Sequence, residues 1–453
     1  MMTIDSMAMI TDNESQVRSY IRNFPAVFKK AKGSWIEDVE GRKYLDFFAG
    51  ASVLNYGHNH PELKKALVDY LSDDNITHSL DMASVARGEF LEAFKRIILE
   101  PRNMDYRVQF PGPTGTNAVE AALKIARKVK GREKIMSFTS AFHGMSLGSL
   151  SVTGNAFKRQ GAGLPLTHSD SMPYCNYFGP EQNTIDYIDR MLADSGSGMD
   201  TPAAAIVETV QAEGGVNVAE KEWLQGLEAL CRKYDMLLIV DDIQTGNGRC
   251  GGFFSFEESG IQPDVVTVSK SISGYGLPLA LTLIRPEYDI WEPGEHNGTF
   301  RGFNPAMVTA KRTLELFWQD DTFEKDVARR GKMMRDFLTA LSEKYPETGG
   351  CPTDRGTCIS PTKSCPKGGG CPRGRGMMQA IEFANHDLAS KISEVAFRHG
   401  LIVETAGPDD QVLKLLPPLT TSDEDLQKGL DIIEKSLVIA LEELGLKKKA
   451  SGE

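Results

Sequence analysis

The sequence predicts an α/β protein whose main sheet is largely parallel and covered by helices on both faces. Two observations support this class. Short apolar runs without polar alternation recur between residues 107 and 284, as expected for strands that are buried on both sides. Segments with apolar residues at helical spacing lie between these runs, for example at residues 220–234. Such alternation implies βαβ units and therefore a parallel sheet between two layers of helices.

At 453 residues the chain is expected to divide into three parts. Residues 1–61 form the N-terminal part of a small domain, residues 62–320 form the large domain, and residues 321–453 complete the small domain. In the first part, Glu40 and Gly41 mark a hairpin turn between two strand-like segments. A helix is predicted to begin near Pro61.

The predicted strands of the large domain lie at residues 107–110, 134–139, 204–209, 237–242, 264–269 and 279–284. After residue 320 this alternation ends. The predicted elements there are helices at 326–345, 388–400 and 423–444 and a strand at 377–383. This order is typical of a smaller α+β domain, which we expect to pack with the N-terminal part.

One segment, residues 349–376, interrupts the pattern. Its 28 residues include eight glycines, four prolines and four cysteines, a composition that discourages regular structure. Its cysteines are Cys351, Cys358, Cys365 and Cys371. None of them stands in a CxxC pair, so the signal for zinc is weak. We interpret the segment as a surface insertion and expect no metal site.

Composition excludes several classes of partner. The net charge of −11 and the pI near 5.4 argue against nucleic acid and anionic membranes, which both favour a basic surface. The basic residues 447–449 are expected to be a solvated tail. No apolar run approaches the ~20 residues that cross a bilayer, and the start lacks the pattern of a signal peptide. Cys175, Cys231 and Cys250 are scattered, which suits a reducing compartment. These features predict a cytoplasmic protein.

Two polar residues follow neighbouring apolar runs and form the first candidate site. Asp241 ends the predicted strand at 237–242, and Lys270 follows the predicted strand at 264–269. The carboxyl ends of adjacent parallel strands share one crevice, where open α/β sheets bind ligands. A lysine there can form a Schiff base with an aldehyde, and an acid can hold a protonated ring nitrogen. This pair is what pyridoxal 5'-phosphate requires.

Two further motifs offer a phosphate site and a ring contact. Residues 111–131 combine a glycine-rich loop with a helical stripe, so Gly115 and Thr116 stand near a helix N-terminus whose free N–H groups attract phosphate. Phe142 and His143 follow the predicted strand at 134–139, where a flat side chain could stack on a ring. Taken alone, each motif also fits an ordinary capped helix or a core phenylalanine.

Together, these residues resemble the class III aminotransferases, on the fold type I scaffold of pyridoxal phosphate enzymes, from about residue 17 to 440. The family signature is D-E-x-Q-T-G-x-G-R, then P-D, a lysine and G-x-P-L. Here it reads DDIQTGNGR from Asp241, PD at 263–264, Lys270 and GLPL at 276–279. The lysine follows the acid by 29 positions, as in the family.

The resemblance implies a seven-stranded type of sheet, pyridoxal 5'-phosphate as cofactor, and a role for each residue of the pair. Lys270 would bind the cofactor aldehyde and later carry the proton, and Asp241 would hold the protonated pyridine nitrogen. The other implied cofactor contacts are Gly115, Thr116, Phe142, His143, Glu208, Ile243 and Gln244. Thr299 would reach the phosphate from the neighbouring subunit of a homodimer with shared active sites, alone or within a larger oligomer.

Glu213, in ETVQAEGG, would lie near the substrate. Lys414 stands where related enzymes carry an arginine that binds an α-carboxylate. Because lysine lacks the two-pronged donor geometry of arginine, carboxylate recognition is expected to differ here or to be shared with another residue.

Within the family, the sequence resembles enzymes that transfer an amino group from L-glutamate to L-aspartate 4-semialdehyde, giving 2-oxoglutarate and L-2,4-diaminobutyrate. The stretches that carry this likeness are residues 47–67, 108–128 and 271–306. This resemblance implies a place at the start of ectoine synthesis or in the supply of diaminobutyrate. Alternatives are transfer to or from ornithine, acetylornithine or 4-aminobutyrate, and an aminomutase on the same fold. A non-catalytic protein that binds the cofactor or a partner is the alternative outside the enzymes.

Overall fold

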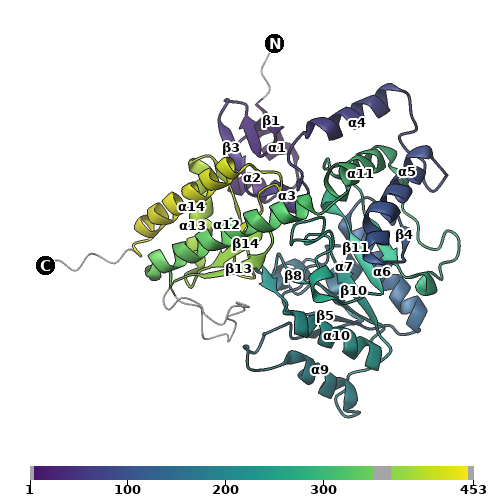
Figure 1. Cartoon of the computed structure of the whole chain (residues 1–453). Helices are drawn as coiled ribbons and strands as arrows, with labels where there is room; N and C mark the ends of the chain where they lie inside the picture. Colours follow the sequence, from purple (N-terminus) through teal and green to yellow (C-terminus); the bar gives the residue numbers. More distant parts are fainter. Residues whose placement is uncertain (1–4, 350–368, 447–453) are drawn as a thin grey trace.

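The computed structural model describes residues 5–349 and 369–446, and its centre is a seven-stranded sheet (Figure 1). The strand order is β4 (Arg107–Gln109), β12 (Leu281–Ile284), β11 (Val265–Val268), β10 (Leu237–Asp241), β7 (Ala204–Val207), β5 (Ile135–Phe138) and β6 (Ser169–Met172). β12 runs antiparallel to both of its neighbours, whereas the pairs from β11 to β6 are parallel. The predicted mainly parallel α/β sheet is confirmed.

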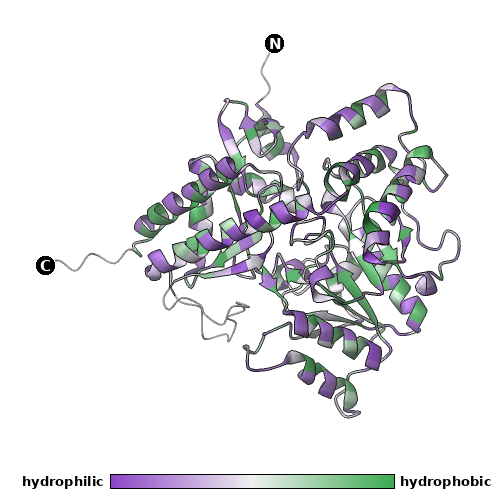
Figure 2. Cartoon of the chain, in the orientation of Figure 1, coloured by the Kyte–Doolittle hydropathy of each residue, from purple (hydrophilic) through white to green (hydrophobic). Residues whose placement is uncertain are grey.

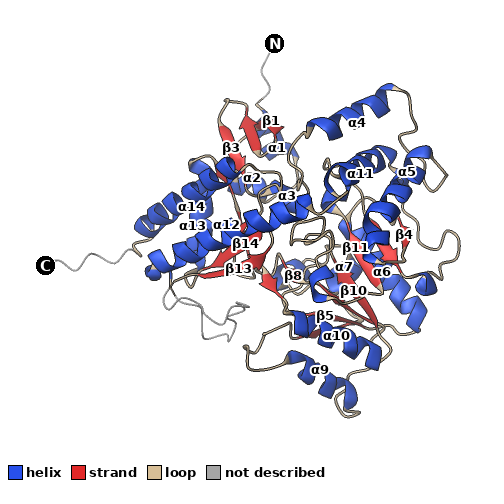
Figure 3. Cartoon of the chain, viewed as in Figure 1, coloured by secondary structure: helices blue, strands red, loops and turns tan. Residues whose placement is uncertain are grey.

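Strand residues alternate between two apolar layers, which explains why the strands read as continuous apolar runs. Leu237 and Ile239 join a core with helix α6 (Gly115–Lys130), and Leu238 and Val240 join a core on the other face. The second face is covered by α5 (Val85–Phe94), α10 (Lys221–Lys233) and α11 (Asn304–Phe317). Figure 2 shows these strands as mainly hydrophobic, and Figure 3 shows the helices around them.

The remaining elements form two smaller sheets. One has the order β1 (Phe28–Lys32), β2 (Trp35–Asp38), β3 (Lys43–Asp46) and β15 (Leu401–Ile402). The other has the order β13 (Cys371–Arg375), β14 (Met378–Glu382), β17 (Val412–Leu415) and β16 (Glu404–Ala406). Helices α12 (Thr322–Lys344), α13 (His386–Arg398) and α14 (Asp423–Glu443) share an apolar core with residues of both sheets. Leu401 pairs in parallel with Leu45, so the two ends of the chain meet in one sheet.

The other described elements are short or lie at the edges. Helices α1 (Ser6–Asn13), α2 (Tyr20–Asn23), α3 (Ala49–Ser52) and α4 (Pro61–Ser72) belong to the N-terminal part. The elements between strands of the seven-stranded sheet in sequence are helices α7 (Leu147–Ser151), α8 (Ala156–Gln160) and α9 (Thr184–Ala193) and the two-stranded ribbon of β8 (Val210–Gln211) and β9 (Asn217–Val218). Within the described ranges, no helix is both long and apolar enough to span a membrane.

Two expectations from the sequence need correction. Strand β6, with the sequence SDSM, was not predicted, because an edge strand can be polar and carry no apolar run. The segment 349–376 was expected to lack regular structure, but Cys371–Arg375 form β13, and residues 350–368 lie outside the described residues. This strand lies at the edge of its sheet, where Pro372 needs no ladder partner on its outer side. Cys371 is buried in this strand, and Cys351, Cys358 and Cys365 lie outside the described residues.

Candidate active site

Asp241 ends strand β10 and is held by three contacts in a buried position. Its Oδ2 lies 2.7 Å from Nδ1 of His143, and its Oδ1 accepts hydrogen bonds from the Ile243 N–H at 3.2 Å and the Thr267 hydroxyl at 3.1 Å. Burial alone would lower the pKa of His143, but the bond and charge of Asp241 raise it overall. The carboxylate is therefore fixed in place and has a histidine behind it.

Lys270 follows strand β11 and begins a 3₁₀ turn, Lys270–Ser273. Its φ of 51° is left-handed, a backbone strain that is uncommon outside glycine and that concentrates at functional sites. Burial lowers the pKa of Lys270 to about 8, against the opposing charge of Glu213. A larger fraction of its side-chain amine is therefore neutral near pH 8 than for an exposed lysine.

Asp241 and Lys270 line one cavity of about 200 Å³. The other lining residues are Gly115, Thr116, Phe142, His143, Gly144, Glu208, Ile243, Gln244 and Thr245. The structure therefore brings together every residue that the sequence assigned to the cofactor within one chain. It does not bring Thr299 into this cavity, since the Thr299 carbonyl instead accepts from Nε2 of His78 at 2.7 Å.

One end of the cavity is the start of helix α6. Asn117 Oδ1 accepts from the backbone N–H of Thr114 at 3.1 Å and from its hydroxyl at 2.8 Å, which fixes the helix start. The first N–H groups of a helix have no partner within it and favour an anion. A Cβ on Gly115 would lie 3.0 Å from Cδ1 of Ile243, so a side chain at this position would crowd the cavity.

Glu208 also lines the cavity. Its Oε2 accepts from the N–H of Phe142 at 2.9 Å, and its backbone carbonyl accepts from the Tyr174 hydroxyl at 2.7 Å. Burial raises the pKa of Glu208 to about 8, so its carboxyl group is largely protonated at neutral pH. This side chain fixes the loop that carries Phe142 without adding a full negative charge to the cavity.

Glu213 and Lys414, predicted to lie near the substrate, form an ion pair at 2.7 Å. Oε1 of Glu213 also accepts from Nε2 of Gln244 at 3.1 Å, and Gln244 lines the cavity. Burial alone would raise the pKa of Glu213, but the positive charge of Lys414 lowers it to about 2. The pair is therefore charged and is connected to the cavity wall.

Sequence reasoning missed Glu404, whose Oε1 lies 3.1 Å from Nζ of Lys414. The signal was present in ETAGPDDQVLKL, where strands flank a turn containing Gly407 and Pro408. Pairing the two strands across this turn places residue 404 opposite residue 414.

Comparisons with known proteins agree with this geometry. The family model described as aminotransferase class-III matches residues 17–361 and 371–437. A diaminobutyrate–2-oxoglutarate transaminase from Halalkalibacterium halodurans is 55% identical over 441 residues, covering 97% of this chain and 98% of that protein. One from Streptomyces avermitilis is 55% identical over 425 residues, covering 94% of this chain and 96% of that protein.

Solved structures show the same fold. The ornithine aminotransferase from Toxoplasma gondii superposes with a TM-score of 0.77 at 26% identity, over 96% of this chain and 94% of that chain. That structure is described as having partial occupancy of PLP at its active site. A Bacillus anthracis aminotransferase superposes with a TM-score of 0.81 at 23% identity, over 96% of this chain and 98% of that chain.

Proposed function

Because the chain belongs to the class III aminotransferase family, whose members use pyridoxal 5'-phosphate, we propose that it interconverts L-glutamate and L-aspartate 4-semialdehyde with 2-oxoglutarate and L-2,4-diaminobutyrate. The observation that carries the choice of substrate is the 55% identity, over 97% of the chain, to a relative of that activity. The cavity that holds Asp241 and Lys270 supports the chemistry.

The donor set of the cavity fits this cofactor. The N-terminus of α6 at Gly115 and Thr116 would hold an anion, and Ile243 and Phe142, which line the same cavity, would contact a flat ring. Asp241 offers a buried carboxylate to a protonated ring nitrogen. When bound, the cofactor supplies an aldehyde that takes up and releases the amino group and a ring that accepts electrons.

Lys270 has two tasks in this proposal. Its amine would hold the cofactor through the cofactor's aldehyde, and the free amine would act as the general base that takes a proton from the substrate carbon. The pKa of about 8 suits this second task, because a base is most effective when its pKa lies near the working pH. Asp241, oriented by His143 and Thr267, would hold the ring nitrogen in its cationic form.

We propose a homodimer in which Thr299 of each subunit completes the site of the other. Large apolar side chains are exposed along residues 68–85 and at Phe300, which marks a surface for association. They are Val68, Leu71, Ile76, Leu80, Met82, Val85 and Phe300. His78 connects the two segments through its backbone pairing with Phe303 and its bond to the Thr299 carbonyl, so the exposed residues nearest His78 lie beside Thr299. Analytical ultracentrifugation of the purified protein tests this assembly, and we expect a mass twice that of the chain.

The enzymatic proposal is tested with the purified protein and added pyridoxal 5'-phosphate. We expect a visible absorbance band in the wild type and its loss in Lys270→Ala, with turnover reduced by at least roughly 10²–10⁴-fold. Lys332→Ala, which removes an exposed lysine of α12, is the matched control and should behave as wild type. A colourless wild type would refute the enzymatic proposal.

Substrate choice is tested by offering aspartate 4-semialdehyde, glutamate 5-semialdehyde, N-acetylglutamate 5-semialdehyde and succinate semialdehyde, each with glutamate. Highest kcat/KM with aspartate 4-semialdehyde supports the proposal. Absence of activity with that aldehyde excludes it and leaves the ornithine, acetylornithine and 4-aminobutyrate alternatives. Amino migration without 2-oxoglutarate would instead indicate an aminomutase.

A further inference from the structure

Lys414 is fully buried between two carboxylates, because of the strand register. Glu404 on β16 and Lys414 on β17 are paired directly across an antiparallel ladder and project from the same face of the sheet. Glu213 approaches Lys414 from the large domain, where its backbone carbonyl accepts from the N–H of Gly407 at 3.0 Å. The cluster therefore lies where the two domains meet.

The cluster contains two acids and one cation. In the described part of the chain, Lys414 is the one cation within ion-pair distance of Glu213 or Glu404. A buried carboxylate without a matching cation is costly, so it binds a proton or a second cation. Glu404 shows this imbalance, because burial raises its pKa to about 7 despite the nearby Lys414.

The two acids differ in their capacity for a further partner. Oε1 of Glu213 accepts from both Lys414 and Gln244, at 2.7 and 3.1 Å. Oε1 of Glu404 is buried and lies 3.1 Å from Nζ of Lys414 without the alignment of a hydrogen bond, and the Tyr20 hydroxyl is the other neighbour that bonds to this carboxyl group. Glu404 is only 6% exposed, so bulk water does not supply the missing partner. The spare acceptor capacity of the cluster is on Glu404.

The cluster begins at the wall of the cofactor cavity. Gln244 lines that cavity and donates a hydrogen bond to Glu213. Glu213 pairs with Lys414, and Lys414 in turn pairs with Glu404. The charges of Glu213, Lys414 and Glu404 all act on the amine of Lys270, so the cluster lies within electrostatic reach of the reacting group. A substrate that reacts at Lys270 would present its far end to a region of this kind.

We propose that Glu404 is the acceptor for the ammonium group at the far end of a diamino acid substrate, with Lys414 beside it. The proposal rests on the proposed function, since L-2,4-diaminobutyrate reacts at its terminal amine and carries both an ammonium and a carboxylate at the other end. Its ammonium supplies the second cation that the cluster lacks. Lys414 stays paired with Glu213. A lysine is sufficient at this position because the pair does not require the two-pronged donor geometry of arginine.

The test compares amino donors that differ only in the distal ammonium. L-2,4-diaminobutyrate is compared with 4-aminobutyrate, and L-ornithine with 5-aminopentanoate, using 2-oxoglutarate as acceptor. In Glu404→Gln, which keeps the shape and removes the charge, we expect the ratio of kcat/KM within each pair to fall by about 10- to 100-fold. Glu404→Asp should retain most of the preference. The KM for glutamate, which has no distal ammonium, should not rise.

The matched control is Glu382→Gln. Glu382 is a buried carboxylate of the same sheet that pairs with Arg373 and lies outside the cluster. Its loss should leave the ratio unchanged. An unchanged ratio in Glu404→Gln, or an equal loss for both members of a pair, would overturn the proposal.

One comparison needs no variant and covers the case in which Glu404→Gln does not fold. Wild-type enzyme should use 1,3-diaminopropane at least 10-fold better than propylamine, and equal use would overturn the proposal. The proposed function fails separately, if the wild type does not use L-2,4-diaminobutyrate at all. The ornithine pair then still tests the role of Glu404.

Discussion

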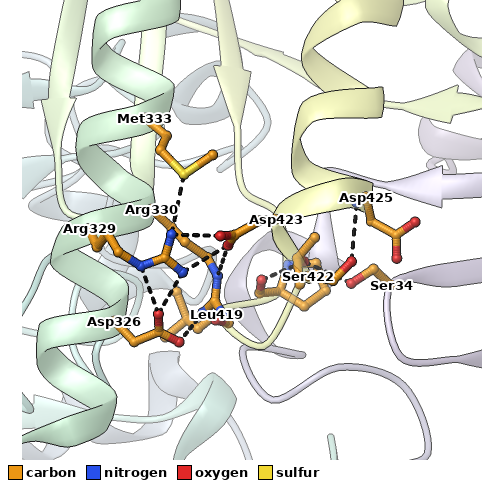
Figure 4. Close-up of polar contacts among 11 residues, drawn as sticks. Ser34, Asp326, Arg329, Arg330, Met333, Leu419, Ser422, Asp423 and Asp425 are labelled. Atoms are coloured by element: carbon orange, nitrogen blue, oxygen red, sulfur yellow. Dashed lines mark hydrogen bonds and ion pairs between the residues drawn. The ribbon is translucent and has the colours of Figure 1, made fainter.

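In each of two charge clusters of this molecule, a central charge lies between two charges of the opposite sign, and in the exposed cluster a second acid, Asp326, also pairs with both outer charges. In the buried cluster, Lys414 lies between the carboxylates of Glu213 and Glu404. In the exposed cluster, Asp423 lies between the guanidinium groups of Arg329 and Arg330 (Figure 4). In the first, Lys414 and Glu404 are buried and Glu213 is partly exposed, whereas side chains of the second are as much as half exposed.

The exposed cluster joins helices α12 and α14. Arg329 donates to both oxygens of Asp423, at 2.7 and 2.8 Å, and also to Asp326 one turn earlier. Asp423 begins α14, whose first turn is capped by the Ser422 hydroxyl, so its negative charge also suits the helix N-terminus. Figure 4 shows the arginines on α12 directed at this helix start.

The difference in exposure separates charges that contribute little to stability from charges that are expected to serve function. Exposed pairs are screened by water and contribute about 0–1 kcal/mol each, even with good geometry. Buried charges cost several kcal/mol to desolvate, so they are poor choices for stability alone. A buried cluster that is one cation short, beside Lys270, is instead expected to recognise a ligand. Three predictions test this contrast.

Removing the cation of the buried cluster should have the largest effect. Lys414→Met leaves Glu213 and Glu404 without their shared partner in a buried site, which costs about 3–5 kcal/mol. We expect lower stability in urea unfolding and a large loss of activity. Lys414→Arg keeps the charge and should lose less of both. Wild-type stability in Lys414→Met would show that the cluster is not electrostatically coupled.

The second largest effect is expected when Glu404→Gln changes how the stability of the protein depends on pH. Glu404 has a pKa of about 7 in the folded protein and near 4.5 when unfolded, so the folded state holds the extra proton between these values. Its contribution is therefore present below pH 4.5 and is lost as the pH rises to about 7, by up to roughly 3 kcal/mol. The neighbouring charged groups are Glu213, Lys414 and Lys270, and the Tyr20 hydroxyl of α2 is the other titratable group that faces Glu404.

This dependence is measured as the free energy of unfolding from pH 4.5 to 8, in wild type and in Glu404→Gln. In the variant, the part of the pH-dependent loss of stability that is due to Glu404 should be absent. The part due to Glu208, whose pKa is raised to about 8, should remain. Parallel curves for the two proteins would contradict the assignment.

The cofactor cavity and the buried cluster also differ in how far the sequence predicted them. The cavity is built from residues at the ends of neighbouring strands or at a helix start, such as Asp241, Lys270 and Gly115. Their places follow from apolar runs and short motifs, which are local. The predicted parallel sheet was confirmed for the same reason.

The cluster depends on contacts between distant residues. Glu404 and Lys414 meet through strand register, and Glu213 meets them only when the two domains pack. The positions of β6 and β13 also depended on partners, since SDSM and CPRGR form strands only beside β5 and β14. A single sequence carries little local signal for such pairings.

The smallest effect is expected at the exposed cluster. Arg329→Ala removes the contacts with Asp423 and Asp326, yet water replaces them and Arg330 remains beside both acids. We expect a loss of about 0–1 kcal/mol in urea unfolding that shrinks further in 0.5 M salt, with unchanged kcat/KM. A loss of more than about 2 kcal/mol would break the contrast, because an exposed cluster would then match a buried one in its effect on stability.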